Sequence, residues 1–353
     1  MENSKVLEGK RILVTGGTGS LGKAIVRRIL SGELGTPASV NVFSRDEAKQ
    51  HFMRLEFLES PNATDEIIYT SARNKLRFTI GDVRDYDSLI RVARDTDIVI
   101  NAAALKQVPS SEYFPSEAIK TNVTGAENVV RAAHDPSTDI DMVVGISTDK
   151  ACKPVNVMGM TKALQERIFI EANREGRARF NCVRYGNVIA SRGSIIPLFI
   201  ERIRARKPIS ITLESMTRFL LPLERAVDTV FEIMSSEDRG ITLVPKITSA
   251  KIIDVAKALM TDGDVGVELT GIRPGEKIHE IMISEEEAPR TESREEYYAI
   301  QPVLPELRDP KFVQGIDGEY SSKDGNLSVD EIRSLLASAD SEIQQFLGTG
   351  GQR

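Results

Sequence analysis

The stretch that decides the fold is TGGTGSLG, residues 15–22, which lies between a predicted strand, RILVTG (11–16), and a predicted helix, KAIVRRIL (23–30). Its spaced glycines are Gly16, Gly19 and Gly22. The first permits a tight turn, the second lets backbone N–H groups approach a pyrophosphate, and the third allows close helix–strand packing. Because a strand and a helix flank it, the loop predicts dinucleotide binding rather than a plain turn, with the remaining contacts from Thr18, Ser20 and Leu21.

The same alternation continues through the first half of the chain. Further buried strands are predicted at 40–44, 76–82, 97–104, 142–148 and 180–187, with helical patterns such as 87–93 and 124–133 between them. This alternation predicts an α/β fold with a doubly wound parallel sheet of the Rossmann type. A closed α/β barrel is the alternative, and the glycine spacing disfavours it.

After residue 187 the pattern becomes looser. Helices are predicted at 194–206, 225–234 and 249–260, the last opened by Ser249, and a strand is predicted at 242–246. Residues 284–298 are acidic and irregular, and a late helix is expected at 328–337 behind a capping box of Ser328 and Glu331. We therefore expect a nucleotide-binding core from residues 1–187 and about 222–246. Residues 188–221 and 247–353 would form a smaller, discontinuous α/β substrate lobe with a C-terminal extension.

Composition excludes several classes of protein. Of 353 residues, 41% are hydrophobic and 28% charged, and 46 basic against 52 acidic residues give a net charge of −6. That balance does not suggest a partner among nucleic acids or anionic membranes. Two cysteines, Cys152 and Cys182, and three histidines cannot build a zinc ribbon, a disulfide scaffold or an iron–sulfur site, so no metal is expected. The polar N-terminus and the absence of a long apolar run predict a cytoplasmic protein.

The end of the second strand bears on cofactor choice. An NAD site usually has Asp or Glu there to bind the ribose 2′-hydroxyl. Here the strand ends in Ser44 and Arg45, with Asp46 next and Lys49 one turn later. A guanidinium suits a 2′-phosphate, so the pattern favours NADP. The alternative is a solvated charge cluster, in which Asp46 could invert the preference.

Other candidate cofactor residues follow the next strands and precede the following helix. An adenine edge would lie near the third strand end, and small side chains after the fourth would let the cofactor pass. Lys106 could face phosphate or substrate, although a solvated lysine is equally compatible with its position. The set is Asp82, Val83, Ala102, Ala103, Lys106 and Asn122.

The strand MVVGIST delivers Asp149 and Lys150 to the carboxyl edge of the sheet, where open α/β sheets bind ligands. Adjacent Asp and Lys suit a reaction that needs one proton donor and one acceptor. A lysine close to a positively charged nicotinamide would have a lowered pKa and could act as a base. The alternative is an ordinary surface ion pair.

Eight motifs occur in one order across residues 11–283, about four-fifths of the chain: TGGTGSLG, FSRDEAKQ, GDVRD, NAAALK, STDKACKPVNVMGMTK, RYGNVIASRGS, MTRF and GIRPGEKIHE. Together they resemble the extended short-chain dehydrogenase/reductases, specifically the UDP-N-acetylglucosamine 4,6-dehydratases that invert C5. Asp-Lys after Ser-Thr, in place of the Asp-Glu of dTDP-glucose dehydratases, makes the resemblance fairly specific.

The resemblance implies a redox-neutral cycle on UDP-N-acetylglucosamine or a related UDP-sugar. The sugar C4 hydride moves to NADP, Lys150 removes the acidified C5 proton, and Asp149 protonates the departing C6 hydroxyl. The hydride returns to C6, which gives a UDP-2-acetamido-2,6-dideoxy-4-hexulose for surface glycan synthesis. The family also implies a homo-oligomer, either a hexamer or a dimer.

Substrate-binding positions carry over from the same resemblance. Asn187 and Arg273 would contact the diphosphate, and Glu276 would accept the uridine ribose hydroxyls. Thr217 and Arg218 match family positions at the substrate, and Lys106 is a further candidate.

One position departs from the superfamily pattern Tyr-x-x-x-Lys. Lys162 is present and can bind the nicotinamide ribose, but Met158 stands where the catalytic tyrosine is usual, and a thioether cannot exchange a proton. Either another group, most plausibly Asp149 or a relayed water, removes the C4 proton, or the chain is an inactive NADP-binding homologue. A nucleotide-sugar epimerase or reductase is the remaining alternative, and an epimerase usually needs the missing tyrosine.

Overall fold

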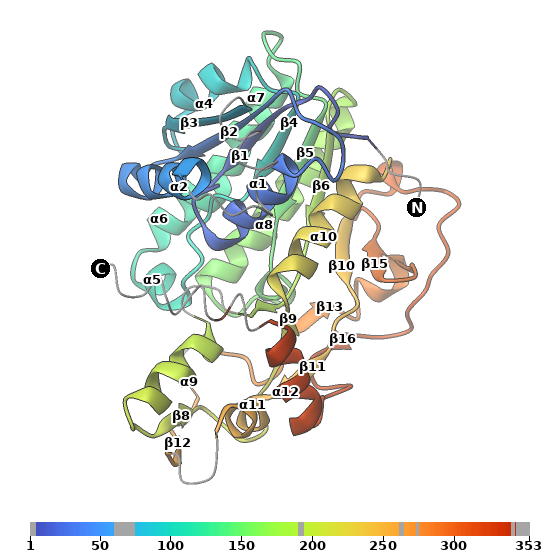
Figure 1. The fold of residues 1–353 in the computed structure, drawn as a ribbon. Coiled ribbons are helices and arrows are strands. Elements are labelled where there is room, and N and C mark those ends of the chain that lie inside the picture. Colours follow the sequence, from blue (N-terminus) through green and yellow to red (C-terminus); the bar gives the residue numbers. More distant parts are fainter. Residues whose placement is uncertain are drawn as a thin grey trace.

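The computed structural model describes residues 5–59, 75–189, 194–260, 265–272, 275–339 and 343. Its centre is a nine-stranded sheet in the order β14-β15-β10-β6-β5-β4-β1-β2-β3 (Figure 1). The seven strands from β10 to β3 in this order run parallel to one another. At the other end, β15 pairs antiparallel with β10, and β14 pairs antiparallel with β15. The predicted fold class, a doubly wound parallel sheet of the Rossmann type, is confirmed.

The parallel strands are short, and all but the edge strand β3 are largely buried. β1 (Arg11–Thr15), β4 (Ile98–Asn101) and β5 (Met142–Ile146) form its centre. Both faces of such a sheet must be covered by helices, and continuous apolar runs such as MVVGI meet that demand. The remaining parallel strands are β2 (Ser39–Ser44), β3 (Leu76–Ile80), β6 (Arg179–Val183) and β10 (Thr242–Pro245).

Helices cover the sheet on both faces. Side chains such as Ile29, Met53 and Val230 pack on one face, from α1 (Ser20–Leu30), α2 (Glu47–Glu59) and α10 (Leu223–Ser235). Leu89 and Phe169 are among those on the other face, which is covered by α4 (Tyr86–Ala93), α7 (Gly125–His134) and α8 (Val157–Ala172). The crossovers of a right-handed βαβ sheet require this two-sided arrangement.

The smaller lobe lies below the sheet in Figure 1 and has its own core. Phe199, Ile252 and Ile332 are among its buried residues, from α9 (Ile195–Arg204), α11 (Ile252–Leu259) and α12 (Val329–Ser338). A small sheet of β7 (Asn187–Val188), β9 (Thr217–Leu221) and β11 (Ser249–Lys251) lies between this lobe and the main sheet. A second small sheet, of β8 (Ile209–Ile211) and β12 (Val267–Leu269), lies within the lobe.

Helix starts are predicted in this lobe at Ser328 and at Ser249. The capping box is confirmed: Ser328 accepts from the Glu331 backbone, and the Glu331 carboxylate accepts from the Ser328 N–H at 2.8 Å. The helix start at Ser249 is wrong, because residues 249–251 pair antiparallel with β9. Burial of that edge against β9 outweighs the local helical pattern.

The acidic segment is also more regular than expected. Within 284–298, residues form β14 (Thr291–Ser293) and the start of β15 (Tyr297–Ile300), both on the main sheet. The segment preceding them is tied to the core by Glu287, whose carboxylate oxygens accept from Arg184 at 2.7 and 2.9 Å. Residues 291–300, expected in the substrate lobe, are therefore part of the core sheet.

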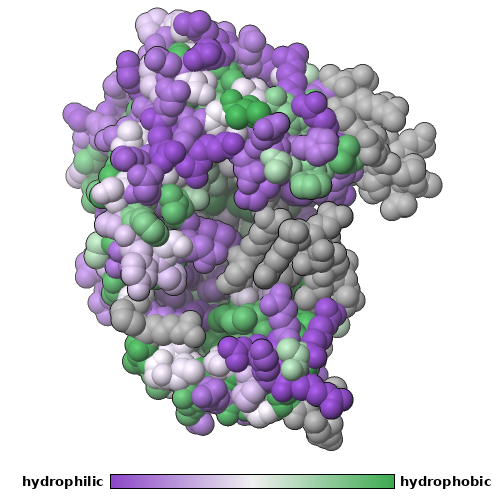
Figure 2. Space-filling view, turned by 90° about the vertical axis from the view of Figure 1, so that its left-hand side faces the viewer, coloured by the Kyte–Doolittle hydropathy of each residue, from purple (hydrophilic) through white to green (hydrophobic). Residues whose placement is uncertain are grey.

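The face seen in Figure 2 is largely hydrophilic over the upper part of the molecule, with hydrophobic patches among the polar side chains. None of the helices in the described part of the chain is both long enough and apolar enough to cross a lipid bilayer. Strand β13 (Ile281–Ile283), which pairs with β16 (Tyr320–Ser321), leads from the lower lobe back to the sheet edge where the predicted site residues gather.

Candidate active site at the carboxyl edge of the sheet

The glycine loop forms a close backbone crossing at the carboxyl ends of β1 and β4. Gly16 has φ +66°, and a Cβ there would lie 2.7 Å from the backbone N and Cα of Ala103. Its N–H donates to the Phe43 carbonyl at 2.8 Å, so the turn is fixed against β2. Helix α1 then begins after Gly19 with no side-chain cap on its first amides. These features fit a loop that presents backbone N–H groups to phosphate.

The end of β4 is held against the same loop. Thr15 Oγ1 donates to Asn101 Oδ1 at 2.7 Å and accepts from the Ala103 N–H at 3.3 Å. Ala102 and Ala103, which follow β4, are partly buried and have small side chains. The two alanines therefore lie beside the glycine loop.

At the ends of β2 and β3 lie the residues expected at the adenosine ribose. The Arg45 guanidinium is half-exposed and approaches Asp82 Oδ2 at 3.6 Å. Lys49 pairs with Asp46 at 2.7 Å, and the side chain of Ser44 accepts from Gln50. Burial raises the pKa of Asp82, but hydrogen bonds from Arg84 outweigh it and the net shift is downward. Arg45 and Lys49 thus offer cations at this corner, each beside a carboxylate.

Asn122 links two parts of the site through its side chain. It lies in a single π-helical turn (Lys120–Thr124), its Nδ2 donates to Leu105 O at 3.0 Å and Thr161 Oγ1 at 2.9 Å, and its Oδ1 accepts from the Leu105 N–H at 2.8 Å. It therefore ties the loop after β4 to helix α8. Lys106, next to Leu105, is exposed on that loop.

Asp149 and Lys150 stand in a short 3₁₀ turn (Asp149–Ala151) directly after β5. Asp149 is fully buried, and its Oδ1 accepts from Thr148 Oγ1 at 2.8 Å and Lys150 Nζ at 3.0 Å. Its other oxygen, Oδ2, is buried and has no hydrogen-bond partner among the described residues. A buried carboxylate oxygen of this kind is costly unless a ligand or reaction uses it.

Lys150 differs from the sequence-based expectation of a lowered pKa. Burial lowers the pKa of its ammonium, but the nearby carboxylates of Asp149 and Glu280 outweigh burial, and the net shift is upward. Glu280 Oε1 lies 3.6 Å from Lys150 Nζ. The expectation concerned a lysine beside a positively charged nicotinamide, whereas in the chain by itself the neighbours of Lys150 include a second carboxylate distant in sequence.

Met158 and Lys162 lie on the first turns of α8. Met158 is buried, and its carbonyl accepts from Thr161 Oγ1 at 2.9 Å. Lys162 is also buried, and Nζ donates to Gln165 Oε1 at 2.7 Å. Burial lowers the pKa of Lys162 to about 8, since only the distant charges of Cys182 and Glu166 oppose it. The position where the tyrosine is usual therefore holds a buried thioether, which has no proton to exchange.

The lobe residues predicted at the substrate fall into two groups. Arg218 is buried and donates to the carbonyls of Thr217 and Ile278. Its Nε lies 3.7 Å from Glu280 Oε1, and Glu280 in turn lies beside Lys150 of the Asp149–Lys150 pair. Thr217 Oγ1 contacts His279 Nδ1 at 2.8 Å. Arg273 lies outside the described residues.

The second group lies further down the lobe. Asn187 has a buried Oδ1 with no hydrogen-bond partner in the described part of the chain, beside a small cavity of about 20 Å³ that Arg218 also lines. Glu276 accepts from Thr212 Oγ1 at 3.2 Å. Asn187 therefore offers an unpartnered amide oxygen among the described residues, whereas the Glu276 carboxylate is already hydrogen-bonded within the lobe.

Sequence reasoning missed Lys277 and Glu280, although both stand in the motif GIRPGEKIHE that it singled out. Lys277 Nζ donates to the Cys152 carbonyl at 2.5 Å, and burial lowers the pKa of Lys277. The signal was the charged pair three residues apart around apolar Ile278, which indicates charges turned to a buried face. Cys152 itself is buried and its thiol pKa is raised by that burial to about 12, which agrees with a packing role.

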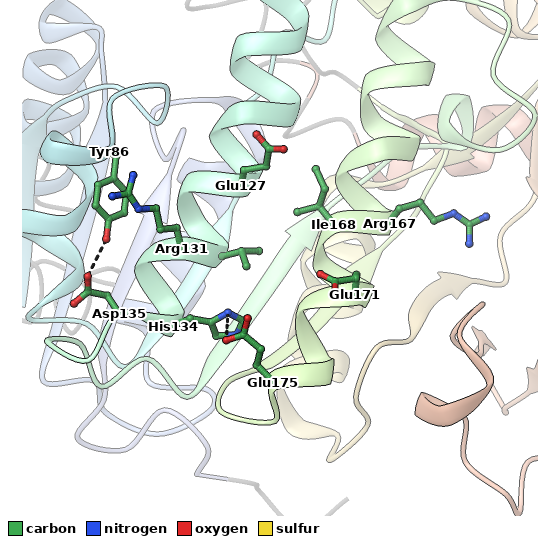
Figure 3. Close-up of a pocket in the computed structure, with 10 residues that line it drawn as sticks. Tyr86, Glu127, Arg131, His134, Asp135, Arg167, Ile168, Glu171 and Glu175 are labelled. Atoms are coloured by element: carbon green, nitrogen blue, oxygen red, sulfur yellow. Dashed lines mark hydrogen bonds and ion pairs between the residues drawn. The ribbon is translucent and has the colours of Figure 1, made fainter.

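A roomier cavity, of about 740 Å³, lies away from this site on the outer side of α7 and α8 (Figure 3). Arg131 stacks on the Tyr86 ring at 3.6 Å, and His134 Nδ1 pairs with Glu175 at 3.0 Å. Its lining holds none of the predicted site residues, so volume alone does not locate the chemistry.

Known proteins with similar sequences include enzymes of nucleotide sugars. The family model described as "Polysaccharide biosynthesis protein" matches residues 12–302. The "UDP-N-acetylglucosamine 4,6-dehydratase (inverting)" of Campylobacter jejuni subsp. jejuni serotype O:2 is 42% identical over 316 residues, which cover 88% of this chain and 86% of that protein. The "UDP-glucose 4-epimerase" of Rickettsia bellii (strain OSU 85-389) is 40% identical over 344 residues, 94% of this chain and 96% of that protein.

Solved structures give the same result. The "X-ray structure of Pen from Bacillus thuringiensis" superposes with a TM-score of 0.83 at 31% identity and covers 95% of this chain and 98% of that chain. A dTDP-glucose 4,6-dehydratase from Streptomyces venezuelae, described with NAD and TYD bound, has a TM-score of 0.63 at 20% identity, with 76% and 86% coverage, and supports the fold alone. The chain belongs to the polysaccharide biosynthesis protein family, within the extended short-chain dehydrogenase/reductases of nucleotide sugars.

Proposed function

We propose that this enzyme is an NADP-dependent 4,6-dehydratase of UDP-N-acetylglucosamine that also inverts C5. Its product would be a UDP-2-acetamido-2,6-dideoxy-4-hexulose for surface glycan synthesis. The observation that carries the proposal is the buried Asp149–Lys150 pair with one carboxylate oxygen left without a partner in the described structure. A relative 42% identical, named as an inverting UDP-N-acetylglucosamine 4,6-dehydratase, supports the reaction.

The residues of the glycine loop fit a dinucleotide. The Gly16 turn leaves no room for a side chain against Ala103, and the uncapped first amides of α1 suit a pyrophosphate. Lys162 would hold the nicotinamide ribose, and Arg45 with Lys49 would receive a 2′-phosphate. When bound, the nicotinamide supplies reversible hydride transfer with the sugar.

Asp149 carries the proton chemistry at C4 and C6. Its free Oδ2 accepts the C4 hydroxyl proton as the C4–H bond is oxidised, which makes Asp149 a carboxylic acid. The same proton then goes to the C6 hydroxyl, which leaves as water and restores the carboxylate. One carboxylate thus performs both transfers, and no tyrosine at Met158 is required.

Lys150 acts at C5. As a neutral amine it removes the C5 proton, which the C4 ketone has acidified, and becomes an ammonium. Asp149, which binds Lys150 Nζ at 3.0 Å, orients the amine and stabilises that ammonium. Delivery of a solvent proton to the opposite face of C5 gives the inverted product, while the proton taken from C5 stays on Lys150.

The lower lobe would bind the nucleotide. Asn187 and Arg218 line one small cavity and would meet the diphosphate and sugar, together with Thr217. Glu276 would accept uridine ribose hydroxyls, and Arg273 would add a charged contact to the diphosphate.

A UDP-glucose 4-epimerase is the second candidate, because relatives of that name in Rickettsia are 40% identical across 94% of this chain. The Asp149–Lys150 pair favours the dehydratase, since epimerisation needs a base at C4 but neither proton removal at C5 nor protonation of the C6 hydroxyl.

One incubation separates these functions. Purified enzyme with NADP and UDP-N-acetylglucosamine in D₂O should give a product lighter by one water that carries deuterium at C5. An epimerase would give an isomer of unchanged elemental composition from UDP-glucose. A chain that binds cofactor and converts neither sugar would overturn the proposal.

A further inference from the structure

Glu280 stands between two cations of the candidate site, Lys150 and Arg218, and binds neither by a hydrogen bond. It directly precedes β13, and only 2% of its surface is exposed. Its Oε1 lies 3.6 Å from Lys150 Nζ and 3.7 Å from Arg218 Nε, which are ion-pair rather than hydrogen-bond distances. Its Oε2 is buried and has no hydrogen-bond partner among the described residues.

The backbone around Glu280 is fixed by the neighbouring strand. Its N–H donates to Ser322 Oγ at 2.9 Å, and its carbonyl accepts from the Ser322 N–H at 2.8 Å. The backbone of Glu280 is therefore held by Ser322 and does not depend on Lys150 for its position.

Four charged groups face Lys150 from three parts of the fold. Asp149 belongs to the same turn, Arg218 to β9, and Lys277 and Glu280 to the segment before β13. The two carboxylates favour the ammonium form of Lys150, and the two cations oppose it. Glu280 is thus the group whose removal changes the balance without touching the Asp149 hydrogen bond.

We propose that Glu280 is a positioning residue that holds Lys150 as an ammonium between two carboxylates and takes up its proton when substrate arrives. The proposal rests on the proposed function of Lys150 as the C5 base. In the step, Lys150 Nζ moves from 3.6 Å to within hydrogen-bond distance of Glu280 Oε1, one Lys150 N–H bond breaks and one O–H bond forms on Glu280. This leaves a neutral amine and a neutral carboxylic acid, so the net charge of the pair is unchanged.

This arrangement solves a problem that the geometry raises. An ammonium cannot remove a proton, and the chain by itself favours the ammonium. Burial penalises both charged forms, so exclusion of water by a bound substrate favours the neutral pair over the ion pair. Lys150 then holds the proton taken from C5 as an ammonium, so Glu280 releases its own proton to solvent after the product leaves, and the ion pair is restored.

The test is Glu280→Gln, measured in two ways. The pH dependence of kcat/KM for dehydration should keep its shape, with the acidic limb moved to lower pH by about one to two units, because Lys150 loses a neighbouring negative charge. Brief labelling with acetic anhydride, read as acetyl-Lys150 by mass spectrometry, should show the same shift in the pH midpoint. The labelling uses the chain without substrate and needs no activity.

Matched variants separate this role from a structural one. Glu280→Asp keeps the charge and should shift both profiles less than Glu280→Gln, and it carries the test if the glutamine variant does not fold. Glu319→Gln removes a carboxylate from Lys153 instead, where the pair is 2.8 Å apart, and should leave both profiles unchanged.

Two results would overturn the inference. A uniform loss of activity with an unmoved acidic limb and an unmoved labelling midpoint would make Glu280 a packing residue. A labelling midpoint that moves to higher pH would also contradict it. If wild-type enzyme does not dehydrate UDP-N-acetylglucosamine, the proposed reaction fails, while the labelling midpoint still decides whether Glu280 controls the Lys150 proton.

Discussion

Gly159, in the first turn of α8, packs directly on the backbone of Lys150: a Cβ on Gly159 would overlap the Lys150 carbonyl oxygen. Helix α8 can therefore approach the turn that carries the reactive pair. The approach is locked by Asn156, which accepts from the Gly159 N–H at 2.8 Å and donates to the Gly275 carbonyl at 2.8 Å. This contact helps to set the position of Lys150 relative to Met158 and Lys162.

Gly159→Ala should push α8 away from the reactive turn. Overpacking of this kind costs about 1–3 kcal/mol of stability, and kcat should fall at least about tenfold because the proton-transfer geometry is lost. Thermal unfolding and steady-state kinetics check this. Gly266→Ala is the control, since nothing lies within 4 Å of a Cβ there. Unchanged kcat in Gly159→Ala would mean that the turn tolerates the displacement.

Met158→Ala should keep substantial turnover, because the proposed C4 base is Asp149. Asp149→Asn should abolish both water loss and the transient absorbance of reduced cofactor in a single turnover. Its amide has no lone pair basic enough to take the C4 proton. Stopped-flow absorbance with product mass analysis checks both. A reduced-cofactor signal in Asp149→Asn at near wild-type rate would leave Asp149 as the acid at C6 only.

Arg45→Glu should weaken NADP binding much more than NAD binding. The substitution places a carboxylate where a 2′-phosphate would meet a guanidinium, and a charge-assisted contact is worth roughly 1.5–3 kcal/mol, or about one to two orders of magnitude in Kd. Fluorescence titration of both cofactors measures the ratio. Lys257→Glu is the control, because the Lys257 side chain on α11 is exposed, and it should change the Kd of neither cofactor. An equal change in both affinities would mean that Arg45 does not contact the 2′-phosphate.

Lys162→Met should change how stability depends on pH. Burial holds the folded pKa of Lys162 near 8, below its ordinary value of 10.5. Below pH 8 folding therefore pays up to about 3 kcal/mol for a buried ammonium, and wild-type stability should rise as pH increases from 8 to 10.5.

In the methionine variant that rise should be absent. The stability advantage of Lys162→Met should be greatest at pH 7 and should shrink by pH 10, as measured by urea unfolding without cofactor. The exposed Lys257→Met is the control, with no such pH-dependent difference. Parallel pH profiles for wild type and Lys162→Met would contradict the buried ammonium.

Glu287→Gln should destabilise the fold by roughly 3 kcal/mol, because it leaves the buried Arg184 with one carboxylate partner, Glu166, instead of two. Burial raises the pKa of Glu287, but ion pairing with Arg184 outweighs it and sets the pKa at about 2. This stabilisation is present above pH 4.5 and is lost as pH falls toward 2.

Glu285→Gln is the control for that variant, since Glu285 pairs with Lys153 at 3.2 Å on the surface and should change stability by less than about 1 kcal/mol. Urea unfolding from pH 3 to 7 compares the two. If Glu287→Gln were as mild as Glu285→Gln, the buried ion pair would contribute little.

The core of the fold could be predicted from the sequence because its signals are local. Apolar runs such as RILVT and MVVGI form buried strands, and the glycine loop sits where the pattern placed it. The errors came from pairing between distant segments. Ser249 becomes a strand because β9 lies beside it, and β15 forms from YYAI because β10 offers an edge.

The candidate site was predictable to the same extent. The glycine loop follows β1, and Asp149 and Lys150 follow β5, so the carboxyl ends of parallel strands bring them to one sheet edge. The charge state of Lys150 was not predictable, because Glu280 reaches it from 130 positions further along the chain. Position in a parallel sheet follows from the pattern, whereas electrostatic environment follows from the folded contacts.

The late antiparallel strands also bear on how the polypeptide is made. During synthesis β10 leaves the ribosome well before β15, the strand that covers its outer edge. Until β15 emerges, β10 offers unpaired N–H and C=O groups to any neighbouring nascent chain. The interval between the two strands is thus the period in which biogenesis of this protein is most exposed to aggregation and chaperone capture.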